Sequence, residues 1–534
     1  MLSTNELLQR EWTGFRRPGR LIAMAAAALA VVVLGLLYAS GNHASCDGPC
    51  PAEPIGPDGS LVNDQFSFLH RDLGADGSIT VRMTSMTGTI TYPPPHHDQI
   101  VPGLVPWAKA GIIIKDGVRP GSSYAALMLT GSHGVRMQYD YRHDIAGSGE
   151  STGSGGPVSA GAPRWLRLTR SGDTVTGYES ADGTRWAKVG TVRLTGLPAT
   201  VQVGLFATSP GDLTLRAAGL GGATEQVRWT QAGGTFDHVA LRGAATAGGW
   251  TDDGVGERNR TDWEKYHKAS GAVEKDGTIT VTGTGDIGPA GTEDGARPVE
   301  RTLGGLALAL LVVLVVAVRF GTTGRRDAER DAEHAAEHGV ESAAEYASGT
   351  ASGASVVTRR RLAAKALVLA AVTFVTGLLA TGIVIPVGAT ILKGNGIPVH
   401  AVSALTGVRV VVATAAALAL AAVLALALGS LLRRAWLAIL VAVLTIAVPY
   451  VVTSVPLLGD DLARWLLRVT PAAGFAAQQT LTEFPQVVAH YAPSTGYFPL
   501  PWWAGTAVLC AYAVTLLGLA LSRLPHGEEP TRRR

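Results

Sequence analysis

Paired carboxylates and neighbouring histidines are the side chains in this sequence that could perform chemistry. Glycoside hydrolysis needs two carboxylates set across a cleft, and the candidate pairs are Glu179 with Asp182 and Asp252 with Asp253. The first pair flanks an expected turn and the second lies in a glycine-rich loop, so neither alternates along one strand. The string HHD at residues 96–98 lacks the second ligand pair of a typical zinc site, which favours a solvated loop. We therefore predict no catalytic residue and no metal ligand.

A nucleotide site is also missing from the sequence. No G-x-x-x-x-G-K-[ST] string occurs, in which backbone amides and a lysine would hold phosphates. The glycine-rich stretch GSGESTGSGG contains no lysine. We expect that this chain is not an enzyme and carries no cofactor.

The cysteines allow one local disulfide. Cys46 and Cys50 lie four positions apart, and a bridge between them could form if their segment is extracellular. So short a loop gains little from closure, and both the bridged and the free form stay open. The third cysteine, Cys510, lies inside an apolar run.

The composition points to a membrane. Hydrophobic residues make up 47% of the 534 residues and charged residues only 16%, against a usual charged share of about 25%. The net charge of +3 and the absence of a basic run with interleaved aromatics argue against nucleic acid as a partner.

Six apolar runs are long enough to cross a bilayer, which takes about 20 residues. They are Leu21–Tyr38, Leu303–Phe320, Leu362–Ile391, Val410–Leu432, Ala435–Val455 and Trp502–Leu521. The third contains Pro386, which could break it.

Arginine clusters flank alternate ends of these runs, and such clusters mark the cytoplasmic side. They comprise Arg10, Arg16, Arg17, Arg20, Arg319, Arg325, Arg326, Arg330, Arg359, Arg360, Arg361, Arg433, Arg434, Arg523, Arg532, Arg533 and Arg534. We therefore expect a multi-pass protein of the cell membrane with both termini cytoplasmic and residues 41–301 extracellular.

The first apolar run could instead belong to an export signal that is cleaved. The twin Arg16–Arg17 resembles a Tat-type signal, but no A-x-A cleavage triplet follows the run. Because five later runs share the same charge pattern, we predict a retained helix over 21–40.

Residues 1–20 form a predicted amphipathic elbow helix on the cytoplasmic side. The string STNE at residues 3–6 is a capping box, in which the serine and glutamate side chains satisfy free amides of a helix start. Leu8, Trp12 and Phe15 share one face, and Pro18–Gly19 breaks the helix before the first span. Such a helix lies in the headgroup layer.

The polar segment 41–301 alternates apolar and polar residues between turn signals, which is typical of an all-β sandwich. We expect its core over about 58–222, with a partial second sheet or return strands over 223–290. The strings WAKAGI, RWLRLTRSG, SADGTRW and VGLFATS resemble the concanavalin-like (laminin-G-like) sandwiches.

The membrane half continues with a second span over 302–320 and an acidic helical cytoplasmic loop over 321–361. A four-span bundle over 362–523 and a basic cytoplasmic tail over 524–534 follow. Within that bundle, residues 460–500 are too short and polar to span. They favour an amphipathic helix, capped by Asp460 or Asp461, and a re-entrant segment on the outer side.

Two strings resemble the permease subunits of type-2 ABC exporters: LLQREWTGFRR at 7–17 and LLRVTPAAGFAAQQT at 466–480. The resemblance implies a separate cytoplasmic ATP-binding subunit that hydrolyses ATP, and a second permease copy or sister permease. Trp12 and Phe15 are candidate hydrophobic contacts for the ATPase, with Arg16 and Arg17 as charge partners; alternatively, these four residues contact only membrane lipid. The inserted sandwich departs from the family pattern and leaves the transported substrate undefined.

The alternative function is a membrane-anchored surface receptor or sensor. Its β-sandwich would bind an extracellular glycan, and its spans would serve only as an anchor.

Overall fold

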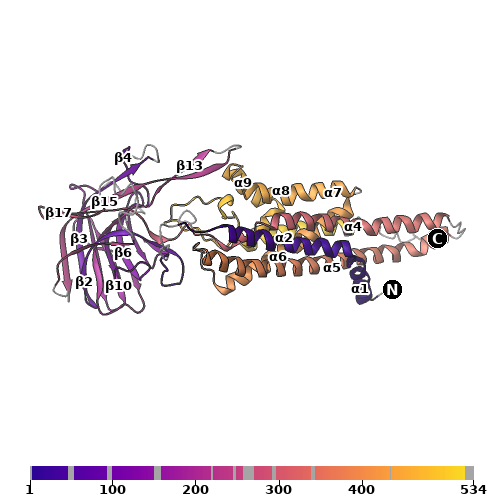
Figure 1. The fold of residues 1–534 in the computed structure, drawn as a ribbon, viewed down its shortest axis with the longest axis horizontal. Coiled ribbons are helices and arrows are strands. Elements are labelled where there is room, and N and C mark those ends of the chain that lie inside the picture. Colours follow the sequence, from indigo (N-terminus) through magenta and orange to yellow (C-terminus); the bar gives the residue numbers. More distant parts are fainter. Residues whose placement is uncertain are drawn as a thin grey trace, which may run out of the picture.

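The computed structural model describes residues 3–45, 53–92, 99–148, 158–217, 221–243, 248–256, 270–291, 296–337, 343–432 and 434–523. The side chains of residues 324–358 lie outside this description. A β-sandwich and a helical bundle lie end to end along the long axis of the molecule (Figure 1).

The sandwich consists of two large antiparallel sheets. In spatial order, the eight-stranded sheet contains β11 (Ala187–Arg193), β10 (Thr174–Ser180), β9 (Arg164–Ser171), β3 (Asp76–Thr91), β15 (Thr230–Gly243), β18 (Thr278–Gly283) and β17 (Gly271–Lys275), with β4 (Ile100–Pro102) paired to β3. The seven-stranded sheet contains β16 (Thr251–Val255), β2 (Phe66–Leu73), β12 (Val201–Thr208), β5 (Lys109–Lys115), β6 (Tyr124–Thr130), β7 (Val135–Tyr139) and β8 (His143–Ala146).

Two short ribbons complete the β-structure. One pairs β1 (Val62–Asp64) with β19 (Ile287–Pro289), and the other pairs β13 (Asp212–Ala217) with β14 (Ala223–Arg228).

Alternation along the strands builds the sandwich core, as the sequence predicts. On β3, Ile79, Val81 and Met83 are buried, whereas the intervening Thr80 and Arg82 are only partly buried. Successive side chains of a strand point to opposite faces, so one face packs inward. Its partners include Ile112 and Ile114 of β5, and Leu127 of β6, all in the same hydrophobic cluster.

Of the two alternatives for residues 223–290, the structure has return strands and not a partial second sheet. β15, β17 and β18 lie in the eight-stranded sheet, and β16 lies at the edge of the seven-stranded sheet. The long β15 pairs with β3 from Thr230↔Ile90 to Gly243↔Gly77. These strands therefore return into the same sandwich, because pairing beside β3 buries Phe236 and Val281 in the common core.

The helical half begins with α1 (Thr4–Phe15) and α2 (Pro18–Gly41). After the sandwich come η2 (Val299–Leu303), α4 (Leu306–Glu337), α5 (Ala343–Gly394), α6 (Ala404–Leu431), α7 (Ala435–Ala442), the π-helical turn η3 (Val443–Ala447), α8 (Val448–Thr453), α9 (Asp460–Val469), η4 (Pro471–Gln478), η5 (Pro493–Thr495) and α10 (Trp502–Ser522).

Six helical segments of the described chain are long and apolar enough to cross a membrane, which confirms the predicted helical membrane bundle. They are Pro18–Gly41, Leu306–Thr323, Arg359–Gly394, Ala404–Leu431, Ala435–Thr453 and Trp502–Ser522. Pro386 does not break the third, since α5 continues to Gly394. The capping box of α1 is also confirmed: the Glu6 amide donates to Ser3 Oγ (3.3 Å) and the Ser3 amide donates to Glu6 Oε2 (2.7 Å).

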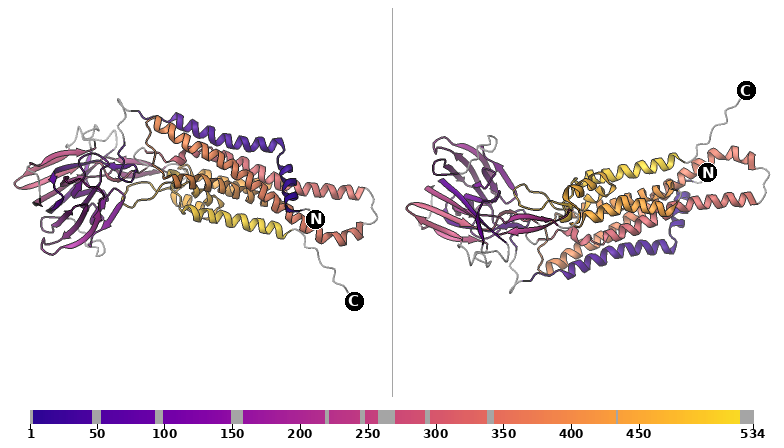
Figure 2. Two further views of the ribbon diagram at one scale, coloured as in Figure 1. Left: turned by 90° about the horizontal axis from the view of Figure 1, so that it is seen from below. Right: turned by 90° about the horizontal axis from the view of Figure 1, so that it is seen from above.

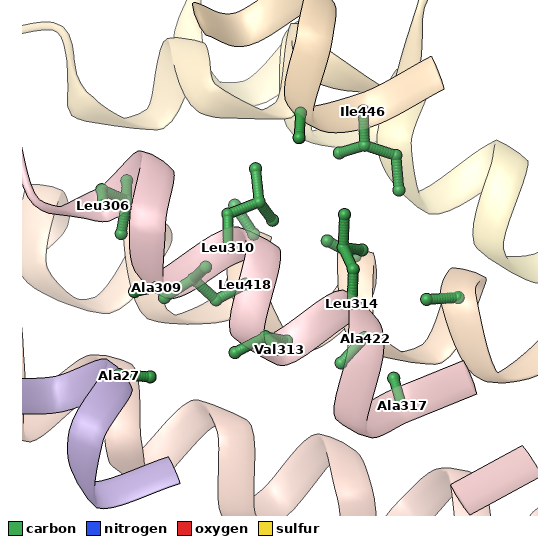
Figure 3. Close-up of a cluster of buried hydrophobic side chains, with 14 of the residues drawn as sticks. Ala27, Leu306, Ala309, Leu310, Val313, Leu314, Ala317, Leu418, Ala422 and Ile446 are labelled. Atoms are coloured by element: carbon green, nitrogen blue, oxygen red, sulfur yellow. The ribbon is translucent and has the colours of Figure 1, made fainter. Parts of the chain in front are cut away.

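The centre of the bundle is built from aliphatic and small side chains. Figure 3 shows Leu310 and Leu314 of α4 with Ala27 of α2, Ala422 of α6 and Ile446 of η3 nearby. Small residues let helix backbones approach closely, which is how helices associate in lipid.

The sandwich and the chain's first helix lie at opposite ends of the bundle. The views in Figure 2 place α1 and the far end of α10 away from the sandwich, and the α4–α5 hairpin extends beyond α1 in the same direction. The molecule thus has one β-rich end and one end formed only by helices.

Candidate functional site

The elbow helix α1 anchors itself to the bundle through Phe15. The Phe15 side chain is fully buried, and its ring meets the Phe320 ring of α4 edge-on, with centroids 5.2 Å apart. Two cations lie over the same Phe320 ring: the guanidinium carbon of Arg20 at 4.8 Å and Nζ of Lys365 at 5.1 Å from its centroid. Cation–π attraction strengthens when such groups leave water, so this cluster fixes α1 against α4 and α5.

Trp12 lies beside the bundle surface. The residue is 43% exposed and lines an apolar groove of about 540 Å³ between α1 and α5. The other lining residues are Leu8, Gln9, Val368, Ala371, Val372, Val375, Thr376 and Leu379. Because this wall of α5 belongs to a candidate membrane span, Trp12 is placed well for contact with lipid.

The structure separates the four predicted docking residues. Phe15 has no exposed surface and packs edge-on against Phe320, so its ring is not accessible to a partner in this structure, and its docking role stays a prediction. Arg16 and Arg17 are exposed after the end of α1. The candidate disulfide of Cys46 and Cys50 lies outside the described residues.

The carboxylates named as weak catalytic candidates have local roles. Glu179 accepts hydrogen bonds from the amide (2.6 Å) and hydroxyl (2.8 Å) of Ser148. Asp182 accepts bonds from the amides of Arg185 and Thr184, which hold the pKa of its carboxyl well below the usual range. The HHD string lies outside the described residues.

A hairpin of the sandwich reaches the membrane half, and this contact has no counterpart in the predictions. The β13–β14 turn forms a bridge between Gly221 and Leu458, just before α9 (Figure 1). Gly222 fits here because a Cβ at this position would lie 1.9 Å from the carbonyl oxygen of Pro456.

His490 joins the same two parts of the molecule. Its Nδ1 lies 3.1 Å from Glu225 Oε1 of β14, and its Nε2 lies 2.6 Å from Asp460 Oδ2 of α9. The predicted cap by Asp460 or Asp461 is therefore wrong: α9 has no side-chain cap, and Asp460 contacts the histidine instead.

Two further sets of contacts lie at the end of the bundle next to the sandwich. Gln486 Nε2 donates to the carbonyl of Arg142 in the sandwich (3.1 Å), and the Arg142 guanidinium lies over the Phe484 ring. Glu300 of η2 accepts from the amide (3.0 Å) and hydroxyl (2.6 Å) of Thr480. Burial raises the pKa of Glu300, with these bonds acting in the opposite direction.

The β1–β19 ribbon packs on the seven-stranded sheet and is held to β5 by buried lysines. Lys115 donates to Asp64 of β1 (2.7 Å), and Tyr141 donates to the same carboxylate oxygen (2.7 Å). Lys109 donates to Asp286, next to β19 (2.5 Å). Burial lowers the pKa of Lys115, and the charge of Asp64 opposes this shift. Both lysine side chains are fully buried, so the β1–β19 ribbon, here called the stalk, is fixed to the seven-stranded sheet.

Inside the bundle, the η4 segment is wholly buried beside two spans. Every residue from Pro471 to Gln478 is buried. The carbonyl of Ala473 lies against Gly505 of α10, where a Cβ would come within 2.1 Å of its oxygen. Tyr450 Oη of α8 donates to Gln478 Oε1 (3.2 Å). The predicted re-entrant segment therefore packs against the first turns of α10.

The apolar face predicted for α9 is exposed in this chain. Leu462, Trp465 and Val469 are 49%, 57% and 39% exposed, whereas Ala463 and Leu467 pack inward. An exposed apolar face beside the spans is typical of an interfacial helix.

Sequence reasoning missed the junction of hairpin, α9 and His490. Glu225, Asp460 and His490 are separated by as many as 265 positions, and none of them belongs to a recognisable string. The one available signal was a histidine between two apolar runs of the membrane half.

Comparisons with known proteins identify no family. No protein-family model matches this sequence, and no curated protein matches it. Among solved structures, a functionally unknown protein from Saccharomyces cerevisiae matches with 14% identity and a TM-score of 0.19, covering 35% of this chain and 88% of its own. Scytalido-glutamic peptidase with a transition state analog inhibitor matches with 8% identity and a TM-score of 0.25, covering 41% and 98%. These scores are too low to relate the chains.

Proposed function

We propose that this chain is the integral-membrane permease subunit of an ATP-driven, type-2 ABC-type exporter with a separate cytoplasmic ATP-binding subunit. In this proposal a second permease copy or a sister permease completes the transport path, and the sandwich is extracellular.

The buried η4 segment carries this proposal. Irregular backbone at membrane depth is tolerated only where protein covers it or where it lines a water-filled cavity. Here η4 packs against Gly505 and Leu509 of α10, and its buried Gln478 accepts a hydrogen bond from Tyr450 of α8. Spans that served only as an anchor would need no such segment, whereas re-entrant segments packed beside spans occur in channels and transporters.

The helical end of the molecule offers two surfaces to an ATPase. Exposed Arg16 and Arg17 follow the fixed α1 helix, and the α4–α5 hairpin extends past them (Figure 1). Because Phe15 ties α1 to α4, a force on α1 would reach the spans. We assign Trp12 to contact with lipid, since a candidate membrane span forms one wall of the groove that Trp12 lines.

Arginine-rich flanks support the orientation with this helical end in the cytoplasm. Single cysteines test it in a background with Cys46, Cys50 and Cys510 replaced by serine. We expect a membrane-impermeant thiol reagent to label Arg119→Cys in the sandwich of intact cells and to spare Asn5→Cys on α1. Labelling of Asn5→Cys in sealed cells would reverse the orientation.

Co-purification tests the function. A Walker-motif ATPase encoded beside this chain should co-purify with it, and Arg16→Ser with Arg17→Ser should weaken that complex at least about tenfold. Each lost charge-assisted hydrogen bond costs about 1.5–3 kcal/mol, and 1.4 kcal/mol is a factor of ten.

The matched control removes the same charge from the other end. Arg119→Ser with Arg193→Ser, both exposed on the sandwich, should leave the complex unchanged. Failure to bind any such ATPase at normal expression would reject the permease function, whereas equal weakening by both pairs would reject the docking surface.

A further inference from the structure

The outward face of the eight-stranded sheet carries a regular array of polar side chains. Strand pairing aligns one row from β11 to β3: Lys188, Tyr178, Arg167 and Thr80. The next row runs from β11 to β15: Thr191, Thr176, Thr169, Ser78 and Arg242. Residues two apart in a strand share a face, so both rows lie opposite the buried Leu166 and Leu168.

Three cations of this array, Lys188, Arg167 and Arg242, form no ion pair within the described part of the chain. Lys188 and Arg242 are exposed. The neighbouring Arg82, by contrast, is neutralised by two bonds to Asp237, at 2.7 and 2.6 Å. Burial and, secondly, the charge of Arg242 lower the pKa of Arg167, which indicates that positive charge accumulates on this face.

Arg167 is held in a fixed orientation. Its guanidinium carbon lies 3.8 Å from the centroid of the Trp186 ring, and its Nε donates to Thr80 Oγ1 at 3.0 Å. A guanidinium has five N–H donors, so the terminal nitrogens stay available. In this fork geometry they suit two oxygens of a carboxylate or phosphate.

The three cations lie on alternate strands of the sheet, Lys188 and Arg167 in one row and Arg242 in the next. They lie on β11, β9 and β15, each two strands from the next. Since neighbouring strands are about 4.8 Å apart, the steps are roughly 10 Å. In a linear polysaccharide with an acidic group on each sugar, every second group can face the same side of the chain, at a comparable interval. Threonine and serine hydroxyls between the cations can donate to and accept from sugar hydroxyls.

We propose that this face of the sandwich binds an anionic polysaccharide. The cations contact its acidic groups, and the hydroxyl rows contact the sugars between them. Polyanions without sugars would leave the hydroxyl rows unused, and neutral glycans would leave the three cations without a counter-charge. The proposal does not depend on the permease function, because it concerns the sandwich surface alone.

Binding of the full-length protein in detergent tests this proposal, with polygalacturonate as the anionic glycan, dextran as the neutral one and inorganic polyphosphate as the sugar-free polyanion. We expect binding to polygalacturonate that weakens with salt, and at least about tenfold weaker binding to dextran and polyphosphate. Arg167→Gln with Arg242→Gln should raise the Kd for polygalacturonate at least about tenfold, a loss of 1.4 kcal/mol.

Arg119→Gln is the matched control, since Arg119 is an exposed arginine in the loop between β5 and β6 of the other sheet. It should leave binding unchanged. Lys188→Gln, which alters an exposed side chain, provides a second test if the double variant misfolds, and it should weaken binding by a smaller factor. Stronger binding of polyphosphate, equal binding of dextran, or an unchanged Kd in folded variants would overturn the proposal.

Discussion

The interiors of the sandwich and of the membrane bundle differ in composition. In the sandwich, β5 places Lys109 and Lys115 in fully buried positions, each against an aspartate of the stalk. In the bundle, the central cluster of α2, α4 and α6 consists largely of Ala, Val and Leu. The hydrophobic effect in water stabilises the sandwich core. That stabilisation can offset the desolvation cost of a buried ion pair. The hydrophobic effect does not drive helices together in lipid, so the bundle depends on close packing.

The two parts of the molecule also contact each other. A sandwich joined to the bundle by its chain connections alone could bind a ligand without affecting the spans. Here His490 contacts both Glu225 and Asp460, and Gln486 donates to the carbonyl of Arg142. A displacement of the sandwich would therefore act on α9 and the neighbouring end of the bundle.

The largest expected effect comes from breaking one buried ion pair in the stalk. Lys115→Met keeps the apolar volume but leaves Asp64 buried without its cation. Removing one partner of a buried pair costs about 3–5 kcal/mol. We expect the free energy of unfolding of the sandwich to fall by that amount, measured by denaturant unfolding of the full protein in detergent with tryptophan fluorescence.

Lys188→Met is the control, because Lys188 is an exposed lysine on the other sheet. Surface substitutions usually stay within about 0.5 kcal/mol. If the two variants were equally stable, the buried pair would contribute nothing to the stalk, and the contrast between the two interiors would fail.

Local patterns in the sequence were sufficient for much of the fold. Hydropathy places all six spans, and the capping box places the start of α1, because these signals lie within one element. Alternation of residue types predicts the two-layer sandwich for the same reason.

Pairing between distant segments could not be predicted in this way. The sequence does not show that β15 lies beside β3, since many alternating strands would fit there equally well. Likewise, the amphipathic pattern of α1 shows that Phe15 lies on its apolar face. The pattern does not show whether this face packs against the bundle or contacts a partner, and only the position of Phe320 decides between the two. From the sequence alone, Lys109 and Lys115 would be taken as surface residues, because no local pattern shows that the β1–β19 ribbon covers them.

The smaller expected effect comes from adding one methyl group in the bundle. Gly505→Ala would place a Cβ 2.1 Å from the carbonyl oxygen of Ala473 and 3.0 Å from Ala476 Cβ. Overpacking of this kind costs about 1–3 kcal/mol. Gly518→Ala in the same helix meets nothing within 4 Å, so it receives only the helix-propensity gain of about 1 kcal/mol.

Comparison of these two variants isolates the packing cost, because both gain the same propensity. We expect Gly505→Ala to melt at a lower temperature than Gly518→Ala when the bundle is followed by the helical circular dichroism signal in detergent. The difference should be largest in the bundle transition and absent from the sandwich transition. Equal melting of the two variants would mean that η4 withdraws from α10 at little cost. The bundle would then lack the close packing that distinguishes it from the sandwich, and the carbonyl of Ala473 would need another neighbour at membrane depth.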